Sequence, residues 1–187
     1  SEILDHMERG DVVTHCFNKL SHKLFDDSGV PLKEVVEAKE RGVLFDAGHG
    51  TSSFSFEVAR KAIKSGFKPD LIGTDIYSWN YNGPVYNLAT TMSKLIAAGM
   101  SLEECIDRVT FIPSKVFDLN DFGTIEVGKP ANLSILRLEN KNSTFVDSMN
   151  IEFTADKIIK MDYTVCNGVL YSVRRYADSI GNKNQIM

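Results

Sequence analysis

Short apolar runs in the first 75 residues alternate with longer stretches whose apolar residues recur at helical spacing. Each of three runs stops at a side chain that can bind a metal or carry a proton. Short strands that alternate with helices are typical of a parallel sheet, whose strands all end at the same rim. The three runs and the residues that follow them are 12–14 with His15, 43–45 with His49, and 71–73 with Asp75.

Helix signals fill the intervals between and after these runs. Pro31 stands where a helix can begin without losing a hydrogen bond, and Gly42 suits the left-handed turn that ends one. Ser101 and Glu104 have the spacing of a capping box. The expected helices cover about 31–41, 54–64, 86–98 and 101–109, with a further helical turn from Pro113.

The composition changes near residue 120, after which strand and turn signals replace helical ones. Asn167 and Gly168 provide the positive φ that a type I′ turn needs, so residues 164–171 form the clearest predicted hairpin. We therefore expect two domains, at 1–120 and 121–187, the second containing a small β-sandwich-like unit that makes no contact with the rim. The other expected strands are 123–127, 133–138, 151–154 and 158–161.

Composition limits the classes of function. The 187 residues, 43% hydrophobic and 25% charged, are enough for a globular core but fewer than the roughly 250 of a complete (β/α)₈ barrel. A formal net charge of −4 provides no basic surface for nucleic acid. Three scattered cysteines favour a reducing, cytoplasmic compartment over a disulfide framework, and no apolar run is long enough for a membrane span.

His15, His49 and Asp75 are the candidate metal ligands, because side chains at the ends of neighbouring parallel strands converge on one pocket. Two neutral imidazoles and a carboxylate are a donor set that suits Zn²⁺. A single histidine after a strand is more often a structural residue, and only the repetition of the pattern favours a metal. The other two histidines lack a preceding strand and are expected to be exposed, whereas Cys16 is expected to be buried as an apolar residue.

Two features of the rim each allow two interpretations. The glycines beside His49 admit a close approach of backbone or substrate, form a tight turn between strand and helix, or do both. The aromatic loop after Asp75 either forms a wall of a substrate pocket or packs onto neighbouring helices. Its aromatic residues are Tyr77, Trp79 and Tyr81.

Several segments together resemble the amidohydrolase superfamily, and most closely its dihydroorotase-like amidohydrolase and deacetylase members. The similarity extends over about residues 4–171, and its motifs are specific in combination. As they stand in this sequence, the motifs are GDVVTHCF at 10–17, FDAGHG at 45–50, FSFEVA at 54–59, TDI at 74–76, NGPVY at 82–86, TMSK at 91–94 and IEVGKPANL at 125–133.

This resemblance implies the carboxyl-terminal part of a (β/α)₈ barrel of the TIM type, and a hydrolase of amide or cyclic-amide C–N bonds in small molecules. It implies Zn²⁺ as cofactor, binuclear in the complete enzyme. By resemblance, His15 and His49 match the two later histidine ligands of the family, and Asp75 matches the aspartate that orients the nucleophilic water and carries its proton. The candidate substrate-binding residues are Gly48, Tyr77, Trp79, Asn82 and Gly83.

The sequence also departs from the family pattern. It contains no His-x-His pair, the strand of the bridging lysine is missing, and Asn132 stands where the family usually has aspartate. We therefore expect this chain alone to be inactive, and to associate with a missing amino-terminal half or with copies of itself. The alternative is a non-catalytic fragment or pseudo-enzyme that serves as a structural or interaction subunit.

Overall fold

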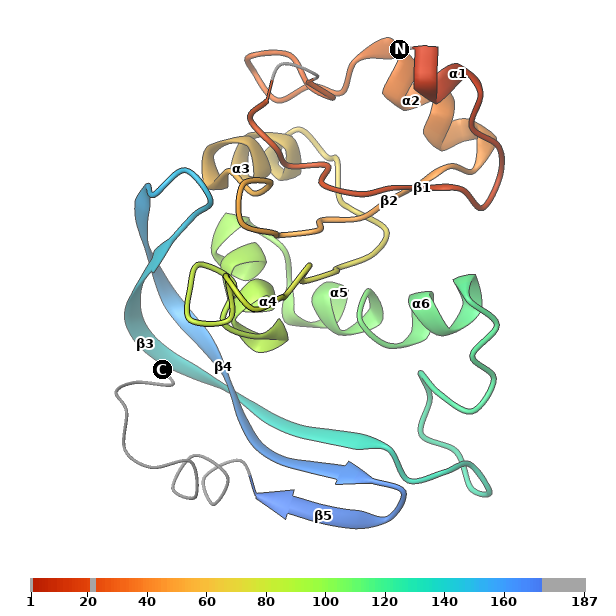
Figure 1. Cartoon of the computed structure of the whole chain (residues 1–187), viewed down its shortest axis with the longest axis vertical. Coiled ribbons are helices and arrows are strands. Elements are labelled where there is room, and N and C mark those ends of the chain that lie inside the picture. Colours follow the sequence, from red (N-terminus) through yellow and green to blue (C-terminus); the bar gives the residue numbers. More distant parts are fainter. Residues whose placement is uncertain (1, 21–22, 173–187) are drawn as a thin grey trace.

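The computed structural model describes residues 2–20 and 23–172, which form short parallel strands, a group of helices and one long β-ribbon (Figure 1). The first half contains α1 (Glu2–Asp5), β1 (Val12–Val13), α2 (Lys33–Arg41), β2 (Leu44–Phe45) and α3 (Phe56–Lys64). The second half contains α4 (Leu88–Ala98), α5 (Leu102–Asp107), α6 (Phe111–Val116), β3 (Leu133–Val146), β4 (Glu152–Cys166) and β5 (Val169–Ser172).

Three parallel segments lie side by side in the order of the sequence. β1 pairs with β2, and on the other side of β2 Asp46 forms a parallel bridge to Leu71. Backbone hydrogen bonds extend this second pairing, because the Gly50 N–H donates to the Thr74 carbonyl at 3.1 Å. The strands predicted at 12–14 and 43–45 are confirmed, whereas residues 71–73 form an isolated parallel bridge at Leu71 in place of a strand. We call the shared carboxyl ends of the three segments the rim.

The helix ends follow the predicted capping chemistry except at the start of α2, which begins at Lys33 after an N-cap at Leu32, so Pro31 lies before the helix. Gly42 ends α2 with a left-handed φ of 94°, and its N–H donates to carbonyls of the last turn. The capping box of Ser101 and Glu104 begins α5 as predicted. The start of α3 differs slightly from the expected 54, because the hydroxyl of Ser55 accepts from the backbone N–H of Val58 and so places the N-cap at Ser55.

Phenylalanine rings fill the core between the parallel segments and the first helices. Phe45 on β2 packs edge-to-face on Phe67 with ring centroids 5.5 Å apart, and Phe25 packs on Phe67 at 4.8 Å. Such offset pairs stabilise a core beyond the area that they bury. Cys16 is 1% exposed and belongs to this core, as predicted.

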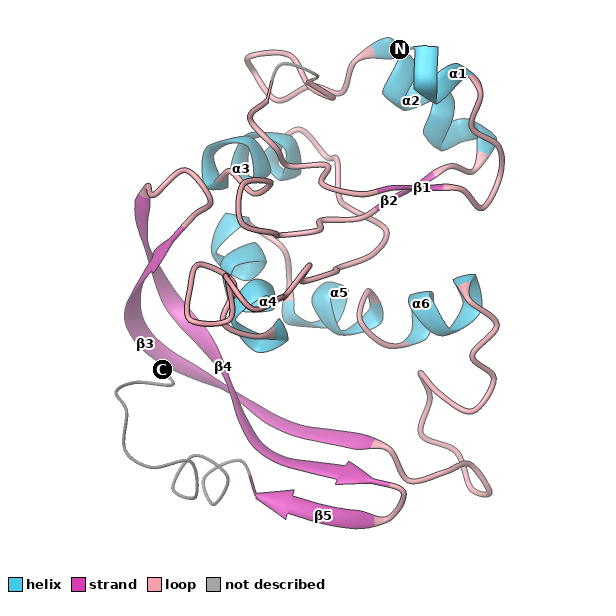
Figure 2. Cartoon of the chain, viewed as in Figure 1, coloured by secondary structure: helices cyan, strands magenta, loops and turns pink. Residues whose placement is uncertain are grey.

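The long ribbon of β3 and β4 runs beside α4, and its tip lies next to α3 (Figures 1 and 2). The Ile159 N–H on β4 donates to the hydroxyl of Ser93 on α4 at 2.9 Å, which fixes the ribbon to the helix. β5 extends the ribbon through the predicted hairpin, in which Asn167 and Gly168 both have positive φ. The strand signals after residue 130 are therefore confirmed.

Two expectations for this region are corrected. Residues 123–127 form turns and coil in place of a strand, because their apolar side chains have nothing to pack against: Ile125 is 87% exposed and Val127 is fully exposed. Within residues 123–172 the structure has one three-stranded antiparallel sheet and no second sheet to complete a sandwich. The expected end of the β unit, at residues 173–176, lies outside the described residues.

Candidate functional site

His15 and Asp75 lie together at the rim, and we call them the open pair. The Nε2 of His15 is 3.9 Å from the Oδ2 of Asp75, with side-chain exposures of 34% and 51%. The Nδ1 of His15 lies 2.6 Å from the Gly48 carbonyl, which can only accept, so this nitrogen carries the proton. The lone pair of Nε2 is therefore free to bind a metal on the side that faces Asp75.

The backbone of the open pair is strained, and amide side chains hold it. His15 has a φ of 62° and Asp75 a φ of 48°, both in the left-handed region. Non-glycine residues persist there only where their surroundings hold them, at a cost of about 1–3 kcal/mol each, and they cluster at active sites. The side-chain amide of Asn18 donates to the His15 carbonyl at 2.7 Å, and that of Asn80 donates to the Asp75 carbonyl at 2.9 Å.

Gly48 must be glycine for His15 to occupy its position. A Cβ at Gly48 would lie 2.2 Å from the Oγ1 of Thr14 and 2.8 Å from the Nδ1 of His15. Nearby, the Asp46 carboxylate accepts from the Thr14 hydroxyl at 2.7 Å and from the Gly73 N–H at 2.6 Å. One carboxylate thus joins the ends of all three parallel segments. Of the two interpretations of the glycines beside His49, the structure shows the tight turn.

The His49 ring does not join the open pair. It is fully buried and stacks on Phe54 with centroids 4.6 Å apart. Its Nδ1 donates to the Gly50 carbonyl at 2.9 Å, and its Nε2 lies 2.9 Å from the Nζ of Lys94. Burial, together with the nearby Lys94 charge, lowers the pKa of His49 to about 4, so the ring is neutral at pH 7.

Both nitrogens of His49 are thus used inside the protein, which corrects the expectation that three ligands converge. In the described part of the chain, no three His, Cys, Asp or Glu side chains are grouped closely enough to bind one metal ion. The other histidines behave as follows: His6 is exposed as predicted, and His22 lies outside the described residues. The sequence patterns did not identify Lys94 as the partner of His49, although Lys94 is the only charged residue of α4.

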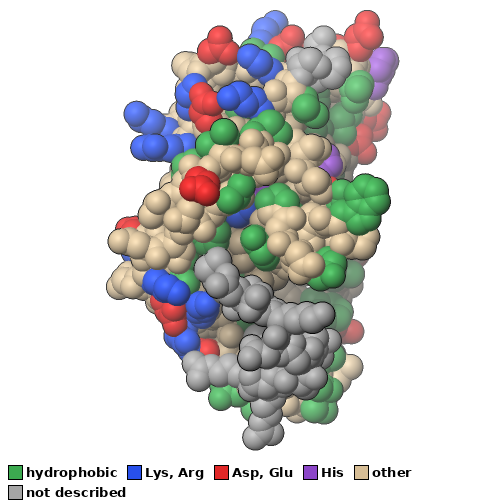
Figure 3. Space-filling view, turned by 60° about the vertical axis from the view of Figure 1, so that its left-hand side comes forward, with side chains coloured by type: hydrophobic (Ala, Val, Ile, Leu, Met, Phe, Trp, Pro, Cys, Tyr) green, Lys and Arg blue, Asp and Glu red, His purple; other side chains and the backbone are tan. Residues whose placement is uncertain are grey.

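The predicted substrate-binding residues of the 76–83 loop lie beside Asp75 in the sequence and are largely exposed. Trp79 is 83% exposed, and Tyr77 is 44% exposed with its hydroxyl 2.7 Å from the Oγ1 of Thr51. Figure 3 shows hydrophobic side chains exposed on one face of the molecule. In this structure the aromatic residues therefore do not pack into the helical core, and their role toward a substrate stays a prediction.

The tip of the ribbon, residues 147–151, contacts the rim, contrary to expectation. The hydroxyl of Ser148 donates to the Gly50 carbonyl at 3.2 Å, and the Phe54 carbonyl accepts from the Ser148 N–H at 2.9 Å. The carboxylate of Asp147 accepts from the Phe56 N–H at 3.1 Å and so also holds the start of α3. Asp147 thus satisfies one of the backbone N–H groups that the first turn of α3 leaves without a partner inside the helix.

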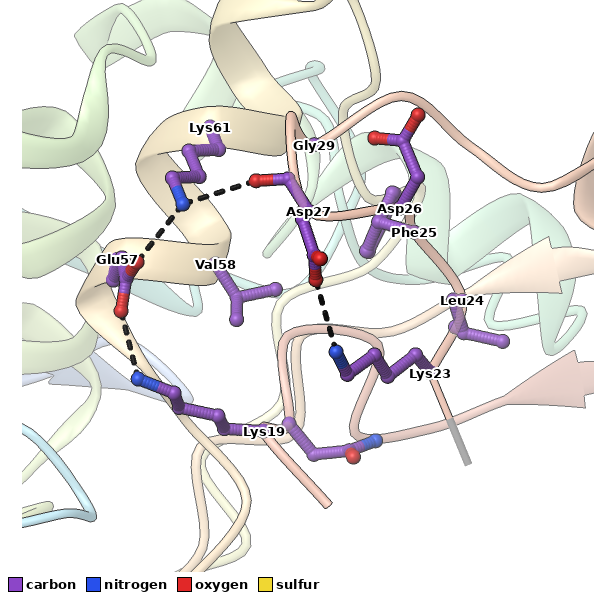
Figure 4. Close-up of a pocket in the computed structure, with 11 residues that line it drawn as sticks. Lys19, Lys23, Leu24, Phe25, Asp26, Asp27, Gly29, Glu57, Val58 and Lys61 are labelled. Carbon is purple, nitrogen blue, oxygen red and sulfur yellow. Dashed lines mark hydrogen bonds and ion pairs between the residues drawn. The ribbon is translucent and has the colours of Figure 1, made fainter. Parts of the chain in front are cut away.

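A separate hollow of about 90 Å³ between α3 and residues 18–29 is a weaker candidate (Figure 4). Glu57 accepts from Lys19 at 2.7 Å and from Lys61 at 2.9 Å, and Lys23 donates to Asp27 at 3.0 Å. The charges therefore neutralise one another, and the volume is below the several hundred Å³ of typical ligand sites. The open pair remains the best candidate site.

Parallel segments joined by helices, with a histidine and an aspartate at their carboxyl ends, are consistent with part of a (β/α) barrel, the class in which active sites lie at this rim. The amidohydrolase family matches residues 21–170. The chain therefore belongs to the amidohydrolase family, as the sequence motifs predicted. No helix within residues 2–20 and 23–172 is long and apolar enough to cross a bilayer.

Known proteins support this assignment. A deacetylase of Enterococcus faecalis is 43% identical to this chain over 172 residues, covering 91% of this chain and 47% of that protein. The crystal structure of an adenine deaminase is 42% identical, with a TM-score of 0.87, and that of a dihydroorotase is 34% identical, with a TM-score of 0.81. Each of these two matches covers 91% of this chain and 47% of the chain in the crystal structure. This chain therefore spans about half the length of these relatives.

Proposed function

We propose that this chain supplies the later half of an amidohydrolase site, in which His15 and Asp75 bind Zn²⁺ and Asp75 carries protons during hydrolysis of amide or cyclic-amide C–N bonds. The observation that carries the proposal is the approach of His15 Nε2 to Asp75 Oδ2, 3.9 Å apart at the rim. The names of the relatives, a deacetylase, an adenine deaminase and a dihydroorotase, support a C–N bond as the target.

The donor atoms of the open pair fit a zinc ion. Two ligand atoms of a tetrahedral zinc at about 2.0–2.1 Å are roughly 3.3–3.4 Å apart. The observed 3.9 Å needs only a small rotation of the half-exposed Asp75 carboxylate. A catalytic zinc takes about three protein ligands, so at least one more must come from beyond this pair. Because the chain spans 47% of its relatives, we place the missing ligands on residues outside these 187.

Each residue of the site has a separate task. His15 and Asp75 would hold the Zn²⁺ ion, which would supply polarisation of an amide carbonyl and a lowered pKa of a water molecule. The Asp75 carboxylate accepts the proton of the attacking water and delivers it to the leaving nitrogen. The Gly48 carbonyl keeps His15 in the tautomer whose Nε2 is free. Substrate contacts are assigned to Gly48, Tyr77, Trp79, Asn82 and Gly83.

Zinc titration of the purified chain, followed by calorimetry, tests the site. We expect weak binding of Zn²⁺, lost in His15→Ala and Asp75→Ala and retained in His6→Ala, which removes an exposed histidine just after α1, outside the three parallel segments. Zn²⁺ binding that is equal in all four proteins would contradict the proposal.

Mixing with a purified amino-terminal half of the Enterococcus faecalis deacetylase tests the activity. The chain alone should not hydrolyse N-acetyl amino acids or cyclic amides, and the mixture should gain both mass and hydrolysis. A stable complex that binds Zn²⁺ but never turns over substrate would favour the alternative, a non-catalytic interaction subunit. Turnover by the chain alone as a monomer would show that two rim ligands suffice.

A further inference from the structure

Lys94 is a buried cation near the centre of α4. Its side chain has no solvent exposure, and its Nζ lies 2.9 Å from His49 Nε2, 2.7 Å from the Pro84 carbonyl and 2.7 Å from the Val146 carbonyl. An ammonium group has three N–H donors, and these three acceptors use all of them. Lys94 therefore joins the 48–50 turn, the loop before α4 and the end of β3, three segments far apart in the sequence.

Packing alone does not require a cation here. Burial lowers the pKa of Lys94 to about 7, while the Asp147 carboxylate opposes that change. Replacing a whole buried charged pair by apolar side chains is often neutral for stability, whereas removing one partner alone leaves the other buried without a partner. An apolar side chain at Lys94 would leave the His49 Nε2 and the carbonyls of Pro84 and Val146 without their donor. The complete set of hydrogen bonds therefore indicates a role in fixing geometry.

The turn that Lys94 holds contacts both members of the open pair. On one side of His49, the Gly48 carbonyl accepts the proton of His15 Nδ1 at 2.6 Å. On the other side, Gly50 lies so close to Asp75 that a Cβ there would be 2.7 Å from its Oδ2. Any movement of the His49 ring would thus displace groups that touch His15 and Asp75.

The ribbon tip provides a second attachment for the same turn. The hydroxyl of Ser148 lies 3.4 Å from the His49 carbonyl and 3.2 Å from the Gly50 carbonyl. Lys94 also holds the Val146 carbonyl, two residues before Ser148. The side chain of His49 is therefore held by Lys94 on α4 and its backbone by Ser148 on the ribbon tip, and Lys94 itself also binds the ribbon.

We propose that Lys94 is a positioning residue for the open pair: its three hydrogen bonds fix the His49 turn, so that the Gly48 carbonyl holds His15 with Nε2 facing Asp75. Ser148 on the ribbon tip is the second part of this arrangement. The inference rests on the proposed function only in treating His15 Nε2 as a metal ligand. The positioning itself is a property of the metal-free chain.

Two-bond ¹H–¹⁵N NMR of the imidazoles tests the positioning in the metal-free chain. In the native chain His15 and His49 should both carry the proton on Nδ1. In Lys94→Met, His15 should shift toward the Nε2–H tautomer, and Zn²⁺ titrated into the same sample should bind about tenfold more weakly, as for other losses of ligand-orienting hydrogen bonds. Lys64→Met, which removes an exposed helical lysine on α3, is the control and should leave both readouts unchanged.

The positioning role of Lys94 and the proposed zinc site can each be contradicted without the other. A folded Lys94→Met chain with the native His15 tautomer and native Zn²⁺ affinity would overturn the positioning role and leave the zinc site standing. If the native chain does not bind Zn²⁺, the proposed zinc site is wrong. The His15 tautomer in Lys94→Met then still tests whether Lys94 positions His15. If Lys94→Met does not fold, Ser148→Ala decides: a native His15 tautomer in that variant overturns the inference.

Discussion

Two histidines follow neighbouring parallel strands in this chain, and the fold gives them opposite surroundings. His15 is partly exposed, with one ring nitrogen held by a carbonyl and the other facing a carboxylate. His49 is buried in the core, where its Nδ1 donates to the Gly50 carbonyl and its Nε2 contacts the buried ammonium group of Lys94. We call His49 and Lys94 the sealed pair. A histidine after a strand is therefore a ligand or a structural residue according to what the second nitrogen meets.

The difference has a local cause in the backbone. His15 itself adopts a left-handed φ of 62°, which turns its side chain toward Asp75 at the rim. Before His49 it is Gly48 that adopts the left-handed conformation, with a φ of 43°. At the first strand the left-handed residue is thus the histidine itself, whereas at the second strand it is the residue before the histidine, and the His49 side chain lies in the core.

The largest expected effect lies in the open pair. Asp75→Asn keeps the shape of the side chain but cannot accept a proton at neutral pH, so hydrolysis by the complete enzyme should fall about 10²–10⁴-fold. Steady-state kinetics of the metal-loaded enzyme measure it, with the exposed Asp121→Asn as a control that should not change. Near-native turnover in Asp75→Asn would assign the proton transfer to another group.

Acid should act on the sealed pair through His49. Its folded pKa of about 4 is below the ordinary 6.5, so between these values the unfolded chain binds more protons than the folded chain. Stability should therefore fall as the pH drops from 6.5 to 4, by up to about 3 kcal/mol. Urea unfolding at several pH values measures this loss. It should shrink in His49→Gln and persist in His15→Gln; an equal loss in all three proteins would contradict the assignment.

Double-mutant cycles compare the two pairs directly. Lys94→Met, His49→Leu and their combination should give a coupling energy of about 1–3 kcal/mol, because each partner leaves a buried polar group unsatisfied when the other is removed. The corresponding cycle of His15→Ala and Asp75→Ala should give about 0–1 kcal/mol, since both side chains face solvent. Urea unfolding at pH 7 provides the energies. Equal coupling in the two cycles would remove the contrast between them.

The smallest effect separates the cost of a conformation from the cost of a clash. Gly48→Ala and Gly66→Ala both place a side chain at positive φ, which costs about 1 kcal/mol. Only the Cβ at Gly48 would meet Thr14 and His15, whereas nothing lies within 4 Å of one at Gly66. We therefore expect Gly48→Ala to lose about 1–2 kcal/mol more stability. A loss equal to that of Gly66→Ala would mean that the rim can relax around the added methyl group.

Much of the fold could be predicted because its signals are local. Gly42 ends α2, Ser101 begins α5, and Asn167 and Gly168 turn the hairpin, each through the conformation or the cap of a single residue. The strand expected at 123–127 failed because alternation indicates a strand only where another strand can pair with it.

The candidate site could be predicted only in part, for a related reason. His15 and Asp75 were found because each lies directly after its own predicted strand. The burial of His49 depends on Lys94, 45 residues away, and on the Val146 carbonyl beyond it. Its one local sign was a single charge in an otherwise uncharged helix, α4. A single charged residue in an otherwise uncharged helix therefore indicates a candidate buried charge.

The attachment of the ribbon tip also sets the order in which this protein can mature. The hydrogen bond from Ser148 to Gly50 closes a loop of 98 residues. Contacts so distant along the chain form late, because the chain must lose much of its freedom before they can repay that loss. During synthesis the rim residues leave the ribosome before β3 and β4, which carry the ribbon tip that binds the rim. Until β3 and β4 have formed and paired, the His49 turn lacks the hydrogen bonds that Ser148 donates to it.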